Sequence, residues 1–188
     1  MIEMIKKIIL FFFFINLFNN SLASVKSKII ENFNHIDNIS FDFIQNIDDL
    51  EEKGKCVIQY PKKIHCTYNN KKKKLIVSNG NSLVIKNQNG KAYFRYLLKQ
   101  TSLMLILDKD LLIKKIEKLE EKLINNQYYI FYLENEGYQI NIFFDKNSYD
   151  LIGWQTEDIY QKLVITYIYK IKKNIDIDQK LFILPKPN

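Results

Sequence analysis

The spacing of hydrophobic residues changes from helical to strand-like early in the chain. Over residues 27–36, apolar side chains recur at helical spacing, which predicts an amphipathic helix. Over 41–47 the period is two, with Phe41 and Phe43 on one face, which is typical of a strand. The pattern therefore places a helix directly before the first strand of a sheet.

Further strands follow in quick succession after a polar turn predicted at 48–53. Asn-Gly pairs at 79–80 and 89–90, and an Asn pair at 69–70, are turn signals that indicate an antiparallel meander. The predicted strands are 54–60, 63–68, 74–78, 82–86 and 91–96, then 128–134, 138–145, 151–157 and 162–171. A final short strand is expected at 181–184, before a proline.

The meander is interrupted in its middle by residues of helical character. Ser102 is placed to cap a short, very apolar helix over 103–107. Local propensity predicts a second helix over 110–124, and Asp108 and Asp110 are further cap candidates. A long antiparallel sheet must curl, and the amphipathic segments are available to cover its concave face. We therefore expect an α+β fold: a curved antiparallel sheet forming an incomplete β-barrel covered by helices.

The N-terminal residues have the three parts of a secretory signal peptide. A basic start precedes the apolar block 8–15, and Ser21-Leu22-Ala23 follows with a small-x-small pattern. The apolar block is too short to span a bilayer, which takes ~20 residues. We expect cleavage between Ala23 and Ser24, which leaves a single domain over 24–188 working outside the cytoplasm. An uncleaved membrane anchor is the alternative.

The composition is that of a folded, basic protein. The formal charge is +7 and 47% of the residues are hydrophobic, which excludes a disordered chain. Arg95 is the only arginine, and because base readout relies on arginine we do not expect nucleic-acid binding. An anionic membrane surface is the more natural partner for an exported basic protein. The one dense basic run, 71–74, is interpreted as a solvated turn.

Cys56 and Cys66 are the only cysteines, and they fall on neighbouring predicted strands. If residues 60–62 form the loop of a hairpin, Cys56 lies directly opposite Cys66 on one face of the sheet. Opposed positions are close enough for a disulfide, which an oxidising compartment favours; two free buried thiols are the alternative. His65 would point to the other face, so a zinc site with these cysteines is not expected.

Motifs for catalysis and cofactor binding are absent from the sequence. His35 and His65 are the only histidines, neither lies in a recognisable nucleophile motif, and there is no Gly-rich phosphate loop. Clustered carboxylates fall in turns or in the charged stretch 117–121, which is typical of a solvated face. We therefore expect no enzyme activity, no metal and no cofactor. The many aromatic residues of the strands fit either a two-sided core or a core plus an apolar cavity.

Several short motifs follow one another in the order seen in a known family. The chain reads Phe-Asp-Phe-Ile-Gln at 41–45, Gly-Lys-Cys-Val-Ile-Gln-Tyr-Pro-Lys-Lys-Ile at 54–64 and Leu-Ile-Val-Ser-Asn-Gly-Asn-Ser-Leu-Val-Ile at 75–85. Thr101-Ser102-Leu103 leads the apolar helix, and Trp154 and Leu181-Phe182 follow near the end. In this order and spacing the chain resembles the periplasmic outer-membrane lipoprotein carrier proteins, the LolA family.

The resemblance implies an incomplete barrel, closed by helices, around an apolar cavity for acyl chains. It implies a periplasmic chaperone that accepts acylated lipoproteins from an inner-membrane ABC transporter of the lipoprotein-release type and passes them to an outer-membrane acceptor. We expect a monomer, no cofactor and only transient contact with the membrane surface. The cavity and its lid are assigned to Phe41, Phe43, Ile58, Tyr60, Ile64, Leu103, Leu105 and Leu107.

Some positions depart from the family pattern. The family carries an arginine immediately before the hairpin proline, where it latches the helices shut in the empty protein; this chain has Tyr60, with Lys62 or Lys63 as the candidate substitute. The family tends to have a proline at the position of Ser102, and it implies that 110–124 is partly strand. Two other functions remain open on the same fold: a carrier or acceptor of other envelope lipids, and an envelope-stress sensor or interaction module.

Overall fold

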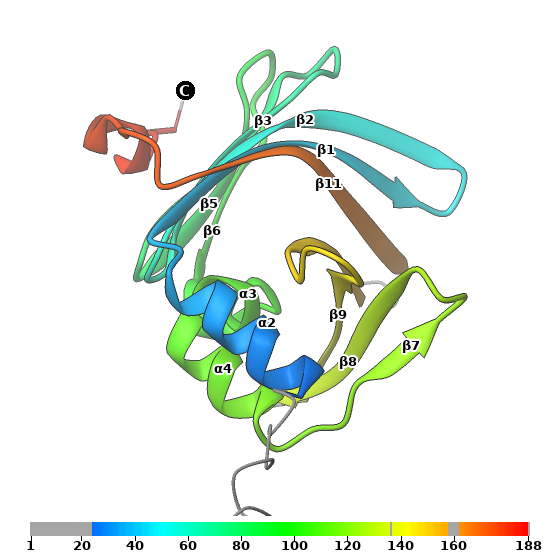
Figure 1. Cartoon of the computed structure of the whole chain (residues 1–188). Helices are drawn as coiled ribbons and strands as arrows, with labels where there is room; N and C mark the ends of the chain where they lie inside the picture. Colours follow the sequence, from blue (N-terminus) through cyan, green and yellow to red (C-terminus); the bar gives the residue numbers. More distant parts are fainter. Residues whose placement is uncertain (1–23, 136, 158–161, 188) are drawn as a thin grey trace, which may run out of the picture.

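The residues that the structure describes form an open sheet of eleven antiparallel strands, which curves around a layer of helices (Figure 1). The computed structural model describes residues 24–135, 137–157 and 162–187. The predicted signal peptide lies outside the described residues. Within the described part of the chain, no helix is long and apolar enough to cross a membrane.

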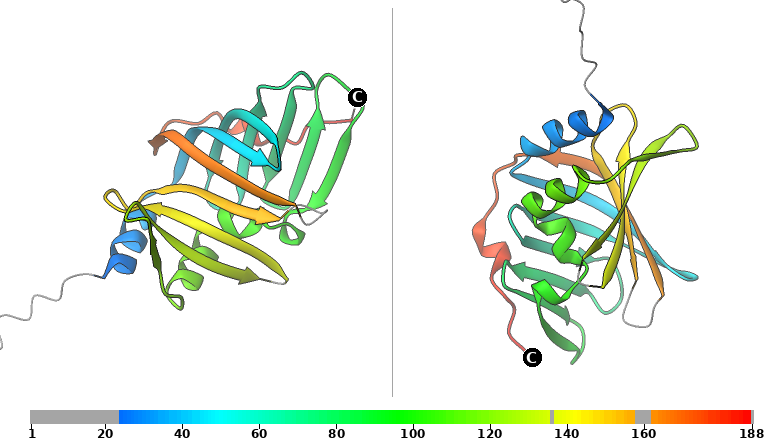
Figure 2. Two further views of the ribbon diagram at one scale, coloured as in Figure 1. Left: turned by 90° about the vertical axis from the view of Figure 1, so that its right-hand side faces the viewer. Right: turned by 90° about the horizontal axis from the view of Figure 1, so that it is seen from below.

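The strands form two meanders that meet in the middle of the sheet. The first meander comprises β1 Asn38–Ile47, β2 Leu50–Gln59, β3 Lys63–Tyr68, β4 Lys74–Asn79, β5 Ser82–Asn87 and β6 Tyr93–Leu97. The second comprises β7 Lys122–Ile124, β8 Tyr128–Asn135, β9 Tyr138–Asp145, β10 Leu151–Glu157 and β11 Leu163–Lys173. Because β1 pairs with β11, the order across the sheet is β6-β5-β4-β3-β2-β1-β11-β10-β9-β8-β7, which leaves β6 and β7 as the two edges (Figure 2). The sheet is therefore curved but not closed, as expected from the sequence.

In the described part of the chain, three α-helices lie against the concave side of the sheet: α2 Val25–Asn34, α3 Leu103–Leu107 and α4 Lys109–Ile116 (Figure 1). The Ser24 side chain accepts a hydrogen bond from the Ser27 amide and begins α2, and the Asp108 side chain accepts from the Leu111 amide and begins α4. Each of these helices has apolar side chains that are buried against the rest of the core. Their buried members are Ile29, Phe33, Leu105, Ile106, Leu107, Leu112 and Ile116.

Two predicted helix features differ in the structure. The helix expected over 110–124 ends at Ile116, and Lys122–Ile124 form β7, which pairs with β8. Hydrogen bonds to a neighbouring strand outweigh local helix propensity here. Ser102 precedes α3, but its side chain makes no capping hydrogen bond.

Two predicted strand boundaries also differ. The polar turn expected at 48–53 is shorter, because β2 begins at Leu50 and pairs with Ile47 of β1. The strand expected at 181–184 is wrong: Gln179–Phe182 form a 3₁₀ helix, η3, whose first turn is capped by the Asp178 side chain. A second 3₁₀ helix, η2, covers Leu98–Gln100.

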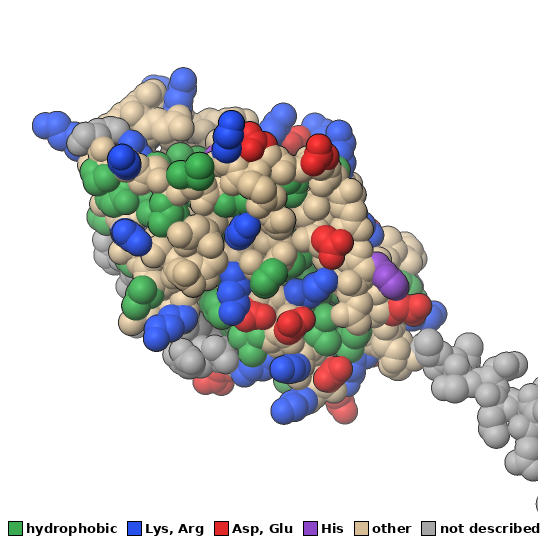
Figure 3. All heavy atoms as spheres, turned by 90° about the vertical axis from the view of Figure 1, so that its left-hand side faces the viewer, with side chains coloured by type: hydrophobic (Ala, Val, Ile, Leu, Met, Phe, Trp, Pro, Cys, Tyr) green, Lys and Arg blue, Asp and Glu red, His purple; other side chains and the backbone are tan. Residues whose placement is uncertain are grey.

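The C-terminal segment covers part of the convex side of the sheet. η3 packs against β3 and β4, where Phe182 is buried beneath the Lys63 ammonium group and Lys63 donates a hydrogen bond to Gln179. Figure 3 shows the face that carries this segment, on which hydrophobic side chains are exposed among lysines. The concave side is thus covered by the helices, and the convex side only in part.

Candidate functional site

The strand register builds an apolar concave face row by row. One row crosses five strands through Phe41, Cys56, Cys66, Ile76 and Ile85. The next row, one pleat further along, contains Ile39, Ile58, Ile64 and Leu83. Because residues two apart in a strand share a face, both rows lie on the same face of the sheet. This is the concave face, where members of both rows pack in one core with the helices.

A disulfide joins two residues of this face. Cys56 lies directly opposite Cys66 and their sulfur atoms are bonded, as the hairpin pattern predicted. The neighbouring His65 occupies the alternate position of β3 and pairs with Val57. Within the residues that the structure describes, no group of His, Cys, Asp and Glu is arranged to hold a metal ion.

A cavity of about 260 Å³ lies between the concave face and the start of α3. Its wall is mainly apolar and aromatic, and it is drawn from both meanders. The apolar lining residues are Phe43, Ile47, Cys56, Ile64, Cys66, Tyr68, Ile76, Ile85, Leu103, Trp154 and Val164. The polar ones are Gln45, Lys74, Ser102, Thr156, Glu157 and Thr166. Such an enclosure, mostly apolar with a few polar groups, is the usual form of a small-molecule site.

The missing side chain of Gly54 shapes the floor of this cavity. Gly54 lies between Phe43 and Tyr68 in the register, and the two rings meet across it with centroids 4.8 Å apart in an edge-to-face arrangement. A Cβ atom at this position would lie 2.2 Å from the carbonyl oxygen of Thr67 and 2.7 Å from the Phe43 ring. Glycine is therefore required for the two aromatic rings to form this part of the wall.

A chain of hydrogen bonds crosses the cavity wall. The Tyr68 hydroxyl donates to Gln45 Oε1 at 3.1 Å, and Gln45 Nε2 donates to Thr166 Oγ1 at 3.0 Å. Burial raises the pKa of Tyr68, and the nearby Glu52 carboxylate adds to the shift, so this phenol is a neutral donor. Lys74 closes one end of the wall, ion-paired with Glu52 and 3.8 Å from the Tyr68 ring centroid.

Lys62 connects the β2–β3 loop to the helical layer. Its amide donates to the Leu107 carbonyl at 2.7 Å, and its ammonium group lies 3.1 Å from Asp108 Oδ2. The other oxygen of Asp108 caps α4 through the Leu111 amide, so one carboxylate serves both the helix and the loop. Of the two lysines considered from the sequence, Lys62 therefore contacts the helices, whereas Lys63 bonds to the C-terminal segment.

Tyr60 lies beneath the same helices without a partner for its hydroxyl. Its ring packs edge-on against Phe33 of α2, with centroids 5.4 Å apart, and the Lys109 ammonium group lies 5.9 Å from the ring centroid. The hydroxyl is buried and forms no hydrogen bond within the described residues. Burial raises the pKa of Tyr60, so the group stays protonated and carries an unsatisfied donor.

The eight residues assigned to the cavity and lid fall into two groups. Phe43, Ile64 and Leu103 line the cavity. The other five are buried where the sheet meets the helices: Phe41, Ile58, Tyr60, Leu105 and Leu107. The lining residues of β10 and β11, among them Trp154 and Thr166, were not predicted as part of the site, because their place depends on the pairing of β1 with β11.

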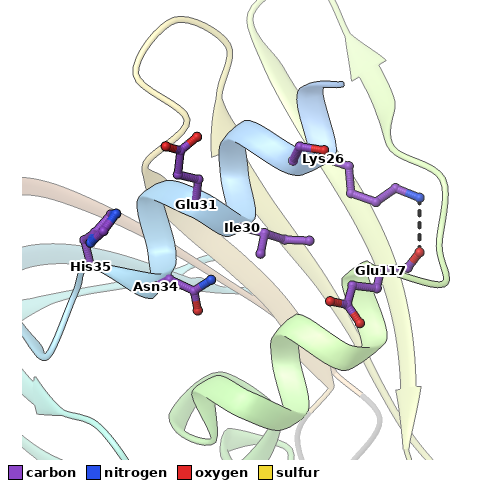
Figure 4. Close-up of a pocket in the computed structure, with 7 residues that line it drawn as sticks. Lys26, Ile30, Glu31, Asn34, His35 and Glu117 are labelled. Atoms are coloured by element: carbon purple, nitrogen blue, oxygen red, sulfur yellow. Dashed lines mark hydrogen bonds between the residues drawn. The ribbon is translucent and has the colours of Figure 1, made fainter. Parts of the chain in front are cut away.

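A larger hollow of about 530 Å³ lies on the outside, between α2 and the end of α4 (Figure 4). Charged and polar side chains surround Ile30 there, and the Lys26 ammonium group donates to the Glu117 carbonyl. A polar surface hollow offers little hydrophobic stabilisation to a ligand. The smaller cavity inside the sheet is therefore the stronger candidate for a binding site.

The sequence matches one family over most of its length. The profile described as "Outer membrane lipoprotein carrier protein LolA" matches residues 34–184. The chain belongs to the LolA family. Members of this family are described as carriers of outer-membrane lipoproteins, and the open, helix-covered sheet is the fold expected of a member. No curated protein sequence gives a significant match.

Solved structures resemble this chain at low sequence identity. An uncharacterized conserved protein from Thermus thermophilus is 8% identical with a TM-score of 0.51, covering 86% of this chain and 93% of its own. A LolA superfamily protein from Nitrosomonas europaea is 10% identical with a TM-score of 0.44, covering 85% and 98%. The Mycobacterium tuberculosis lipoprotein LppX is also 10% identical, with a TM-score of 0.42, covering 85% and 100%.

Proposed function

We propose that this protein binds the acyl chains of lipoproteins in the cavity between its sheet and helices, and carries them across the periplasm from the inner to the outer membrane. The observation that carries the proposal is the apolar cavity of about 260 Å³ on the concave face, lined by Phe43, Ile64 and Trp154 and covered by α3. Membership of the LolA family supports the cargo class. The proposed donor is an inner-membrane ABC transporter of the lipoprotein-release type, and the proposed recipient is an outer-membrane acceptor.

The energetic requirement for such a carrier is large. Each methylene hidden from water contributes ~0.8 kcal/mol, so acyl chains do not leave a membrane for water unaided. The cavity in this structure is smaller than the ~300–1,000 Å³ that drug-sized ligands occupy. Loading therefore requires α3 and α4 to move away from the sheet, which would expose the two buried rows that contain Phe41 and Ile58.

The contacts of Lys62 suit a lid that must open. A partly exposed ion pair with Asp108 contributes ~0.5–1 kcal/mol, and the bond to the Leu107 carbonyl adds a similar amount. These contacts take the place of the arginine latch that the family resemblance implied. Tyr60 acts in the opposite direction, since its unpaired hydroxyl is hydrated only when the helices move away.

Binding of a fluorescent fatty acid tests the cavity directly. Leu103 is half-buried and lines the cavity, so Leu103→Glu places a charge on the apolar wall and should weaken binding at least tenfold. Ile183→Glu makes the same type of change at a side chain that is 67% exposed outside the cavity, and should leave binding unchanged. Equal affinity of both variants would contradict the proposed site. Lipids extracted with the purified protein would distinguish lipoproteins from other envelope lipids as cargo.

A further inference from the structure

Positive charge is concentrated in one half of the sheet. Between Glu52 and Asp108 the sequence has no acidic residue, but it has eleven lysines and Arg95. This segment therefore carries +12, and the rest of the chain carries −5, since the whole chain carries +7. Among the described residues, ion pairs to carboxylates involve only Lys53, Lys62 and Lys74 of these twelve side chains.

The unpaired charge gathers at two neighbouring hairpin tips. Lys71, Lys72 and Lys73 lie exposed in the β3–β4 loop, and Lys91 lies exposed in the β5–β6 loop. The Gln88 and Asn89 amides of the second loop donate to the carbonyls of Lys73 and Lys72, at 3.2 and 3.1 Å. The loops therefore lie side by side, at the top of Figure 1, and we call these four lysines the cationic tip.

The cationic tip borders one end of the cavity. Tyr68 and Lys74 line the cavity, and they also line a surface hollow that continues to Lys73 of the tip and to Gln88 of the β5–β6 loop. On the edge strand β6, Phe94 lies in the same cross-strand row as Ile85 of the cavity wall, and it is 52% exposed. An exposed aromatic side chain and a group of lysines thus lie at the same end of the molecule.

We propose that the cationic tip docks this protein on an anionic lipid surface, with the adjacent end of the cavity facing that surface. Lysine ammonium groups on flexible stems suit a diffuse anionic surface, whereas specific recognition of a carboxylate favours the planar fork of arginine. The guanidinium of Arg95, the only arginine, donates to the Ser82 hydroxyl and is not part of the cationic tip. Phe94 adds an aromatic side chain of the kind that settles at a membrane interface.

Docking of the empty protein on lipids alone is a property separate from lipoprotein carriage. Lipid docking would place the cavity where acyl chains leave or enter a membrane. An acidic protein surface is the competing partner for the same lysines. Vesicle binding in the absence of any lipoprotein separates the two, and its outcome does not depend on whether the protein carries lipoproteins.

Co-sedimentation with vesicles tests the proposal. The protein is purified after export, its N-terminus is read by mass spectrometry, and binding is compared between phosphatidylglycerol-containing and purely zwitterionic vesicles. The test variant replaces Lys71, Lys72 and Lys73 with glutamine. The control replaces Lys114, Lys118 and Lys172, which are exposed on other parts of the molecule, with the same residue and the same loss of charge.

We expect wild-type protein to prefer the anionic vesicles, and salt to weaken the binding. Each lysine near such a surface is worth about a fivefold change in partition, so the test variant should bind on the order of a hundredfold more weakly. The control should lose only severalfold. Equal losses in the two variants, or no preference of the wild type for anionic vesicles, would overturn the proposal. Circular dichroism of both variants checks that the fold is retained.

Discussion

Removing a single hydroxyl from Tyr60 should make the protein more stable. The Tyr60 hydroxyl is buried and has no hydrogen-bond partner in the described structure. Leaving a buried donor unsatisfied costs about 1–3 kcal/mol, and Tyr60→Phe removes that cost without breaking a bond. Part of the gain is lost because the oxygen leaves a small void. We therefore expect a net increase of about 1 kcal/mol in the free energy of unfolding, or about 2–4 °C in Tm for a domain of this size.

Tyr68 provides the matched control, because it is equally buried but hydrogen-bonded. Tyr68→Phe removes the donor to Gln45 and leaves the amide oxygen of Gln45 without it. We expect the free energy of unfolding to fall by about 1 kcal/mol. The two substitutions should therefore change stability in opposite directions, and the free energies of unfolding of the two variants should differ by about 2 kcal/mol. Denaturant unfolding followed by circular dichroism, with the disulfide kept oxidised, measures both. If Tyr60→Phe destabilised the protein as Tyr68→Phe does, the Tyr60 hydroxyl would have a partner and the reasoning would be refuted.

Three further changes probe other parts of the structure. Gly54→Ala should lower the free energy of unfolding by about 2 kcal/mol or more, because the added Cβ would clash with the Thr67 carbonyl. Gly90→Ala is the control and should have a smaller effect, because its Cβ would make only ordinary contacts. Equal unfolding midpoints of the two variants would contradict this reasoning. Asp108→Asn keeps a helix cap but removes the ion pair to Lys62, so it should accelerate fatty-acid uptake in stopped-flow fluorescence; an unchanged rate would argue against a latch. Burial lowers the pKa of His65 below its ordinary value of 6.5, so the folded protein binds fewer protons than the unfolded chain, and stability should fall as the pH drops below about 6.5. His65→Gln should flatten that pH dependence in urea unfolding, and an unaltered slope would exclude His65 as its source.

The strand pattern of the first meander was predictable from sequence because local signals agreed. Alternating apolar residues and short polar turns fixed the β2–β3 hairpin, including the opposition of Cys56 and Cys66. The short strand β7 was not predictable from local propensity, since its three residues become a strand only by pairing with β8. Its strand character was implied by the family resemblance alone.

The candidate site was predictable only in part, because it is assembled by contacts between distant segments. Phe43 and Ile64 lie on strands with a clear inward face, so their place on the concave side follows from periodicity. Trp154 and Thr166 reach the same cavity because β11 pairs with β1, a contact between the two ends of the domain. The ion pair of Lys62 with Asp108 likewise joins residues 46 positions apart, and no local pattern indicates it.

Release of lipoproteins from living membranes tests the central claim most directly. Spheroplasts that retain ATP are incubated with the purified protein, and the supernatant is examined for lipoproteins in a soluble complex with it. We predict ATP-dependent release with wild-type protein and with Ile183→Glu, and little or no release with Leu103→Glu. A wild-type protein that stays folded and binds fatty acid but releases no lipoprotein, while an active carrier does so in parallel, would contradict lipoprotein carriage and leave another lipid as the cargo.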